Sequence, residues 1–153
     1  MQMRPSELSR FLSRILSAVA FAKLDVRAAG ASDVADAAFQ VSGELSHLNE
    51  IRPLDHHKRD GELIRVPAAT LTRILDEAGA PTHIDFMSID TEGAELEVLK
   101  GPNLQRYCID FICVEHNFVV EKRTAIRRVL DHAGYRCVSN AASLSDDWFV
   151  SGT

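Results

Sequence analysis

The chain is predicted to have an α/β fold, in which strands and helices alternate along one domain of residues 1–153. Two apolar runs, at 84–89 and 109–115, are typical of strands covered on both faces in a parallel sheet. Segments with helical apolar spacing precede and follow them, and such alternation indicates parallel βαβ units. With 153 residues, of which 46% are hydrophobic, the chain is long enough to bury a sizeable core.

The first half of the chain is predicted to contain one helix and three short strands. Residues 6–19 place six apolar side chains on one helical stripe, and Ser6 stands where an N-cap belongs. A helix docked on a sheet is favoured over a targeting sequence, which the arginines and serines there also resemble. The strands are expected at 24–29, 38–41 and 62–66. The polar stretch 42–60 is long for a compact domain.

The second half gives clearer start and stop signals. Thr70 can cap a helix over 71–78 that Gly79 ends. The strand at 84–89 leads into a helix over 94–100, which Gly101 and the following proline stop. After the strand at 109–115 come an amphipathic helix and a closing antiparallel pair, at 122–133, 135–138 and 148–150.

A carboxylate-rich turn follows the strand at 84–89. Asp90, Thr91, Glu92 and Glu95 gather there, and Gly93 permits a tight turn. Ligands of open α/β sheets bind just beyond the carboxyl ends of strands, so this is a candidate site. Glu95 falls in the middle of the apolar arc of its helix, so it is either buried and hydrogen-bonded or directed into the crevice. A purely structural alternative is that Asp90 caps the helix and Glu95 only favours its positive end.

Composition excludes several classes of protein. The net charge of -5 and a pI near 5.6 argue against non-specific nucleic-acid binding. No apolar run approaches the roughly 20 residues of a membrane-spanning helix. The three cysteines have no Cys-x-x-Cys spacing, so buried reduced thiols in a cytoplasmic protein are expected: Cys108, Cys113 and Cys137.

The turn and its helix resemble the signature of the FkbM-type S-adenosylmethionine-dependent methyltransferases. That signature is an aspartate, a variable residue, Glu-Gly-Ala-Glu and an apolar helix ending in Lys-Gly, and this chain carries it from Asp90 to Gly101. Further segments resemble the family in order over residues 24–150, most strongly over 62–139: Ala31-Ser32-Asp33, Val66-Pro67, Thr70-Leu71, Val114-Glu115-His116 and Gly134-Tyr135.

The resemblance implies a Rossmann-like class I methyltransferase sheet and S-adenosyl-L-methionine as cofactor. It implies O-methylation of a hydroxyl on a sugar, glycan or polyketide-like small molecule. Ser32 and Asp33 would flank the adenine. Asp90 would lie near the methionine end of the cofactor or position the substrate. Because a weakly acidic hydroxyl needs a proton acceptor, the candidate bases are Glu92, Glu95 and His116.

The chain departs from the family at its N-terminal side. No two of its eight glycines are separated by a single residue, so the glycine-rich cofactor turn is absent. The first strand, first helix and second strand are therefore expected to be missing, which would leave the strand at 24–29 without a neighbour and the strand at 84–89 with a bare apolar edge. Such an edge predicts that the isolated chain is marginally stable, forms a homo-oligomer, or borrows strands from a partner. The alternative function is a non-catalytic Rossmann-like interaction module.

A metal site is not predicted. The carboxylates after residue 89 could bind a divalent cation, as in a carboxylate-metal hydrolase, but no other motif supports a metal cage. His56 and His57 stand between two aspartates, and adjacent histidines in a polar loop are more often solvated than metal-bound.

Overall fold

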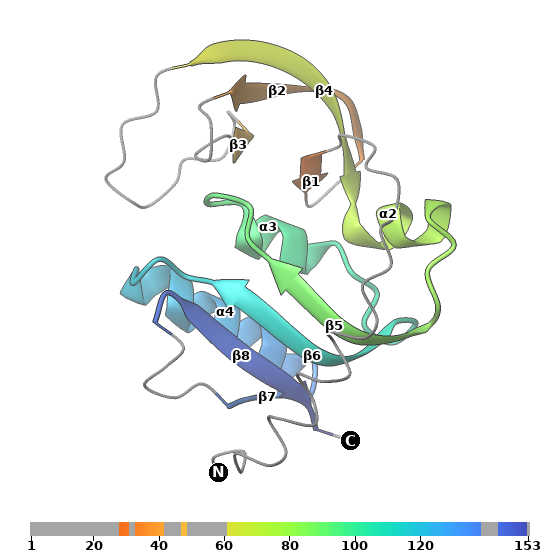
Figure 1. The fold of residues 1–153 in the computed structure, drawn as a ribbon, viewed down its shortest axis with the longest axis vertical. Helices are drawn as coiled ribbons and strands as arrows, with labels where there is room; N and C mark the ends of the chain where they lie inside the picture. The colour runs from red at the N-terminus through yellow and green to blue at the C-terminus, as the bar shows by residue number, and fades with distance from the viewer. Residues whose placement is uncertain (1–27, 31–32, 42–46, 49–60, 139–143, 153) are drawn as a thin grey trace.

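The computed structural model describes residues 28–30, 33–41, 47–48, 61–138 and 144–152, which form two four-stranded sheets and three helices (Figure 1). The first sheet has the order β1-β4-β2-β3, with bounds Ala28–Gly30, Glu62–Thr70, Val34–Val41 and His47–Leu48. The second has the order β5-β6-β8-β7, with bounds His83–Ile89, Cys108–Glu115, Asp146–Ser151 and Tyr135–Cys137. The helices are α2, α3 and α4, at Leu71–Glu77, Glu95–Lys100 and Val120–His132.

Both sheets are mixed, so the α/β class is confirmed but the expected parallel sheet is not. β1 pairs with β4 and β5 with β6 in parallel, whereas β2–β3, β2–β4, β6–β8 and β7–β8 are antiparallel. The prediction that the strand at 24–29 lacks a neighbour is wrong, because β1 aligns with Ala68, Ala69 and Thr70 of β4. Backbone N–H and C=O groups must find partners, and the long strand β4 offers them. The Rossmann-like order and the missing strands remain predictions.

The helices begin and end close to the predicted positions. Thr70 caps α2, because its side chain accepts a hydrogen bond from the Arg73 N–H. Gly79 follows α2 with φ of 63°, and Gly101 caps α3. Ile126 and Leu130 of α4 are fully buried. The predicted helix at 6–19, most of the polar stretch at 42–60 and the His56–His57 pair lie outside the described residues.

The core of the second sheet lies between its strands and both α3 and α4 (Figure 1). One buried cluster joins the strands to the two helices through Ile89, Val98, Ile112, Ile126 and Phe149. Hydrophobic burial of this kind contributes roughly 25 cal/mol per Å² of apolar surface. It fixes the carboxyl ends of β5 and β6 next to the starts of α3 and α4.

The prediction that the strand at 84–89 is covered on both faces is wrong. Among the described strands β5 pairs only with β6, so it is an edge strand, and Ile89 is its only buried residue. Phe86 is 37% exposed and starts an aromatic row across the sheet. The ring centroids are 5.9 Å apart for Phe86 and Phe111, and 6.1 Å apart for Phe111 and Trp148. The bare apolar edge expected from the sequence is therefore present in the described structure.

None of the three cysteines forms a disulfide in the described structure, and only two of them are partly covered. Cys113 and Cys137 are half-buried, whereas Cys108 is exposed at the start of β6, so its predicted burial is wrong. Burial raises the pKa of the Cys113 thiol to about 11. No helix in the described part of the chain is long and apolar enough to span a bilayer.

Candidate functional site

The turn after β5 is held by the side chain of Glu95. Glu92 and Gly93 have φ of 52° and 110°, and the first value is uncommon for a residue with a side chain. Glu95 Oε1 accepts hydrogen bonds from the N–H of Thr91 at 3.1 Å and of Gly93 at 3.0 Å. Glu95 is fully buried, so the buried, hydrogen-bonded alternative holds. The capping role considered for Asp90 is wrong, because Ala94 is the N-cap and makes no side-chain hydrogen bond.

A lysine from α4 completes the environment of Glu95. Lys122 Nζ lies 2.7 Å from Glu95 Oε2 and 4.0 Å from Glu115 Oε2. Lys122 is itself 6% exposed, so the ammonium and the Glu95 carboxylate are both removed from water. Buried charges are retained only when they are paired and hydrogen-bonded. The pair therefore ties the turn after β5 to α4.

The carboxyl ends of β5 and β6 bring further carboxylates to the same place. Ile89 aligns with Val114, so Asp90 and Glu115 leave the sheet side by side. Asp90, Glu95 and Glu115 each offer an oxygen within 4.8 Å of the others. This confirms the expectation that the two strands present polar groups at one edge. We call Asp90, Glu92, Glu95 and Glu115 the acidic cluster.

The pKa of Glu115 is raised at this edge of the sheet. Burial and then the negative charge of Asp90 raise it, the Lys122 ammonium opposes them, and the result is a pKa of about 7. The neighbouring strand β8 places Asp146 beside Glu115, and burial followed by the charge of Asp90 raises the pKa of Asp146 as well. Within the described residues, carboxylates thus outnumber the Lys122 ammonium at this edge.

The acidic cluster has the geometry of a metal-ion site, but the ammonium group of Lys122 already lies beside it. Three carboxylate oxygens within reach of one another are typical ligands of a hard divalent ion. The Lys122 ammonium contacts two of these three carboxylates. A second group, His83, Cys108 and Asp110, lies at the other end of β5 and β6, where His83 Nε2 is 3.0 Å from Asp110 Oδ1. We assign no metal to either.

The candidate base His116 lies next to the acidic cluster in sequence but faces another group. Its Nδ1 accepts the N–H of Phe118 at 3.0 Å, so the proton of the neutral ring is on Nε2. Nε2 lies 3.8 Å from Asp147 Oδ1, and the His116 side chain is 1% exposed. Burial lowers the pKa of the imidazole. The structure therefore gives His116 no free nitrogen lone pair directed at the cluster.

The partner of His116 belongs to a buried ionic network. Asp147 accepts hydrogen bonds from the guanidinium groups of Arg123 and Arg127, at distances from 2.5 to 3.2 Å. Its side chain is 1% exposed, whereas the two arginine side chains are 39% and 44% exposed. The network joins β8 to α4. The network was not predicted from the sequence, although the i, i+4 spacing of the two arginines places them on one helical face.

The residues expected near the adenine are only partly described. Ser32 lies outside the described residues. Asp33 follows β1, and its carboxylate accepts the Thr70 N–H at 2.8 Å and lies 3.5 Å from Arg73. The backbone hydrogen bond is the main reason why the pKa of Asp33 is lowered. These contacts place Asp33 at the start of α2 rather than in the acidic cluster.

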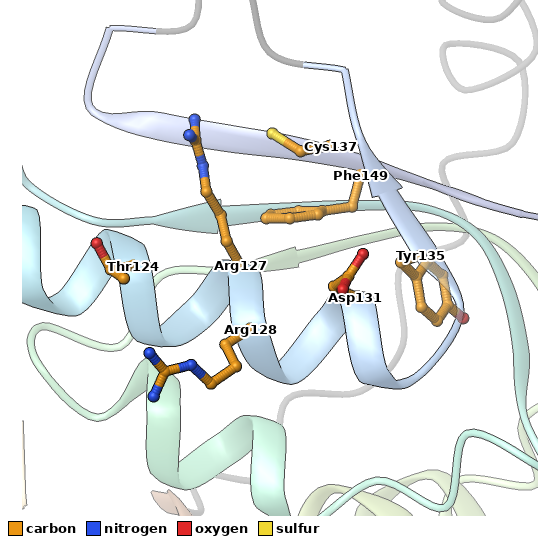
Figure 2. Close-up of a pocket in the computed structure, with 7 residues that line it drawn as sticks. All are labelled: Thr124, Arg127, Arg128, Asp131, Tyr135, Cys137 and Phe149. Carbon is orange, nitrogen blue, oxygen red and sulfur yellow. The ribbon is translucent and has the colours of Figure 1, made fainter.

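A shallow groove lies elsewhere, between α4 and the strands β7 and β8 (Figure 2). It has a volume of about 350 Å³ and is lined by Thr124, Arg127, Arg128, Asp131, Tyr135, Cys137 and Phe149. Figure 2 shows that Arg127 reaches toward the Cys137 strand, whereas Arg128 points to the other side of the helix. The two cations do not converge, and no residue predicted from the sequence to be functional lines the groove.

Exposed apolar side chains lie just after β6 and just before β8. Phe118 and Val120 follow β6 and are 68% and 69% exposed, and Leu144 is 72% exposed. The loop before β8 lies against the loop after β6, because Ser145 O accepts the N–H of His116 at 2.8 Å. Asn117 and Phe118 have φ of 50° and 59°, a backbone conformation that is uncommon for residues other than glycine, although asparagine adopts it more readily than most.

Comparison with known proteins assigns the family. No curated protein and no solved structure matches the chain at a significant level. The sequence profile of the methyltransferase FkbM domain matches residues 15–137, which is most of the chain and includes the turn, the acidic cluster and α4. The chain therefore belongs to the FkbM methyltransferase family.

Proposed function

We propose that the chain transfers a methyl group from S-adenosyl-L-methionine to a hydroxyl oxygen of a sugar, glycan or polyketide-like small molecule. Family membership supports the reaction class. The observation that carries the proposal is the acidic cluster at the joint carboxyl edge of β5 and β6, where α/β folds bind ligands.

The residues at this edge fit the charged end of the cofactor. S-adenosylmethionine carries a positive sulfonium and a positive ammonium group, and complementary charge favours its binding beside Asp90 and Glu92. Thr91 Oγ1 is buried and has no hydrogen-bond partner in the described structure, so it can accept a donor of the ligand. When bound, the cofactor supplies an electrophilic methyl group.

The surrounding residues would keep this edge in one conformation. The hydrogen bonds of Glu95 and its ion pair with Lys122 fix the turn that carries Asp90 and Glu92. Methyl transfer depends on alignment of the attacking oxygen more than on covalent help, so a rigid turn is useful there. The exposed Phe118 and Leu144 provide an apolar surface that favours an acceptor with an apolar part and excludes water from it.

Binding of the cofactor tests the proposal directly. By isothermal calorimetry the chain is expected to bind S-adenosylmethionine, and the double substitution Asp90→Ala and Glu92→Ala should weaken binding at least about tenfold, because two charges facing the sulfonium end are lost. Glu121→Ala, which removes an exposed carboxylate on α4, is the control and should leave the affinity unchanged. Unchanged affinity and turnover in the double variant would refute the assignment. A wild-type chain that binds no S-adenosylmethionine would favour the interaction module.

We also propose that β5 mediates self-association. It is an edge strand in the described structure and carries the exposed ring of Phe86, a combination that invites pairing with a second copy. Analytical ultracentrifugation is expected to show a concentration-dependent oligomer that Phe86→Lys dissociates, because a charge at the edge opposes pairing. Leu63→Lys, at an exposed apolar position of β4, is the matched control. A wild-type chain that stays monomeric at high concentration contradicts the proposal.

A further inference from the structure

We propose that Glu115 is the catalytic residue that takes the proton from the acceptor hydroxyl, and that Lys122 is the positioning residue that holds it in place. The inference rests on the proposed methyl transfer and names its base. Glu115 is not one of the bases predicted from the sequence, which are Glu92, Glu95 and His116.

Accessibility and hydrogen bonding separate Glu115 from two of the candidate bases. The side chain of Glu95 is 0% exposed, and both of its oxygens have partners. His116 uses Nδ1 to accept a backbone N–H. The side chain of Glu115 is 14% exposed, so it can be reached from the edge of the sheet. Its contacts in the described structure fall on Oε2, which accepts the Asn117 Nδ2 hydrogen bond at 2.9 Å and faces Lys122, so Oε1 is left for a ligand.

The charges that face Glu115 come from four elements. Asp90 and Glu92 lie on the turn after β5, Glu95 on α3 and Asp146 on β8, and all are carboxylates. Lys122 of α4 is the cation that faces Glu115 among the described residues. Burial together with the charges of Asp90, Glu92 and Glu95 raises the pKa of Glu115 to about 7, and the ammonium opposes the rise. A base with a pKa near the working pH combines a sufficient ionised fraction with a useful affinity for the proton.

The proton and electron balance of the step is simple. As the hydroxyl oxygen forms its bond to the methyl carbon, the hydroxyl proton moves to the Glu115 carboxylate. The electron pair of the broken carbon–sulfur bond stays on the sulfur of the sulfonium donor, which becomes a neutral thioether. Glu115 then releases the proton to water. No metal ion or oxidant is needed.

Titration of the Glu115 carboxyl tests the inference without the cofactor. In carbon-13 NMR of chain labelled at glutamate carboxyls, the signal that disappears in Glu115→Gln is expected to titrate near pH 7. Lys122→Met should move this midpoint upward, because an attractive positive charge is lost, and Lys122→Arg should leave it nearly unchanged. If Lys122→Met does not fold, Asp90→Asn replaces it and should move the midpoint downward. A Glu115 midpoint near 4.5, or a midpoint that neither substitution moves, overturns the inference.

Unfolding measured against pH gives a second readout. Because the pKa of Glu115 is raised in the folded chain, its contribution to stability is full below pH 4.5 and is lost as the pH rises through about 7. The lowered pKa of His116 acts in the opposite sense, so its contribution is present above pH 6.5 and is lost as the pH falls. Both the wild type and Glu115→Gln contain His116. Subtracting the pH dependence of the free energy of unfolding of the variant from that of the wild type therefore cancels the contribution of His116. A difference that is flat between pH 4.5 and 7.5 overturns the inference.

Activity then separates this inference from the proposed function. Glu115→Gln is expected to lower kcat about 10²- to 10⁴-fold and to remove the rise of kcat with pH around neutrality, with S-adenosylmethionine binding retained. If Glu115→Gln transfers methyl groups at the wild-type rate and with the wild-type pH profile, the catalytic role of Glu115 is refuted and the proposed function stands. A chain that binds no S-adenosylmethionine and transfers no methyl group refutes the proposed function, and the catalytic role fails with it.

Discussion

Replacing Arg123 and Arg127 together by methionine is expected to lower the free energy of unfolding by about 3–5 kcal/mol. Both guanidinium groups bond Asp147, whose side chain is 1% exposed, and His116 offers it only a neutral ring nitrogen at 3.8 Å. Without the arginines the buried Asp147 carboxylate loses both of the guanidinium groups that bond it. Urea unfolding followed by circular dichroism measures the change.

Two further variants identify the cause of this loss. Adding Asp147→Asn to the double variant should restore much of the stability, since the uncompensated charge is then gone. Arg128→Met, at the next position of α4, should change the stability by no more than about 0.5 kcal/mol, because this exposed side chain points away from the strands (Figure 2). Equal effects of Arg127→Met and Arg128→Met as single substitutions would contradict a specific role for the network.

Element positions after residue 61 could be predicted because local signals determine them. Apolar periodicity, the Thr70 cap and Gly101 give the bounds of the helices to within a residue or two. Strand order depends on long-range pairing that periodicity does not encode, and for this reason the two-sheet arrangement and the β1–β4 pairing were not predicted. The exposure of β5 was not predicted either, because an apolar run does not show whether other elements cover one face of the strand or both.

The meeting of carboxylates at the ends of β5 and β6 was predicted from the sequence, but the hydrogen bonds and ion pairs that hold them were not. The rule that parallel strands end at one edge correctly brought Asp90 and Glu115 together. The hydrogen bond of His116 could not be inferred from the sequence. It depends on the left-handed backbone conformation of Asn117 and Phe118, which directs the Phe118 N–H to Nδ1 of the ring. The burial of Lys122, by contrast, is indicated by its position in the sequence. It stands four and eight residues before Ile126 and Leu130, in the middle of the apolar stripe of α4.

Glu95 lies on the buried side of α3, as Lys122 lies on the buried side of α4. Each is a charged residue on the buried side of a short helix, and the two helices contact one another. Two opposite charges on facing apolar stripes predict a buried ion pair, since neither could be buried alone. This pattern is readable from the sequence once the two helices are assumed to share a face of the sheet.

A double-mutant cycle on this pair is expected to show strong coupling. Glu95→Gln keeps an acceptor for the Thr91 and Gly93 N–H groups but removes the nearer carboxylate from the Lys122 ammonium, which keeps only the more distant contact with Glu115 at 4.0 Å. Lys122→Met removes the ammonium group from the buried Glu95 carboxylate. Each single substitution should therefore destabilise the chain by about 3–5 kcal/mol. The double variant leaves no uncompensated charge at this pair, so it should be at least about 2 kcal/mol more stable than the sum of the two losses predicts.

The exposed pair Glu97 and Lys100 on α3 supplies the matched control for this cycle. Its charged atoms are 2.5 Å apart, as close as those of the buried pair, but the side chains are 34% and 55% exposed. Water screens such a pair, so Glu97→Gln and Lys100→Met should couple by no more than about 0.5 kcal/mol. Because the two cycles differ mainly in burial, similar coupling energies would show that removal from water does not stabilise the Glu95–Lys122 contact. The turn carrying Asp90 and Glu92 would then have to be held by the two Glu95 hydrogen bonds alone.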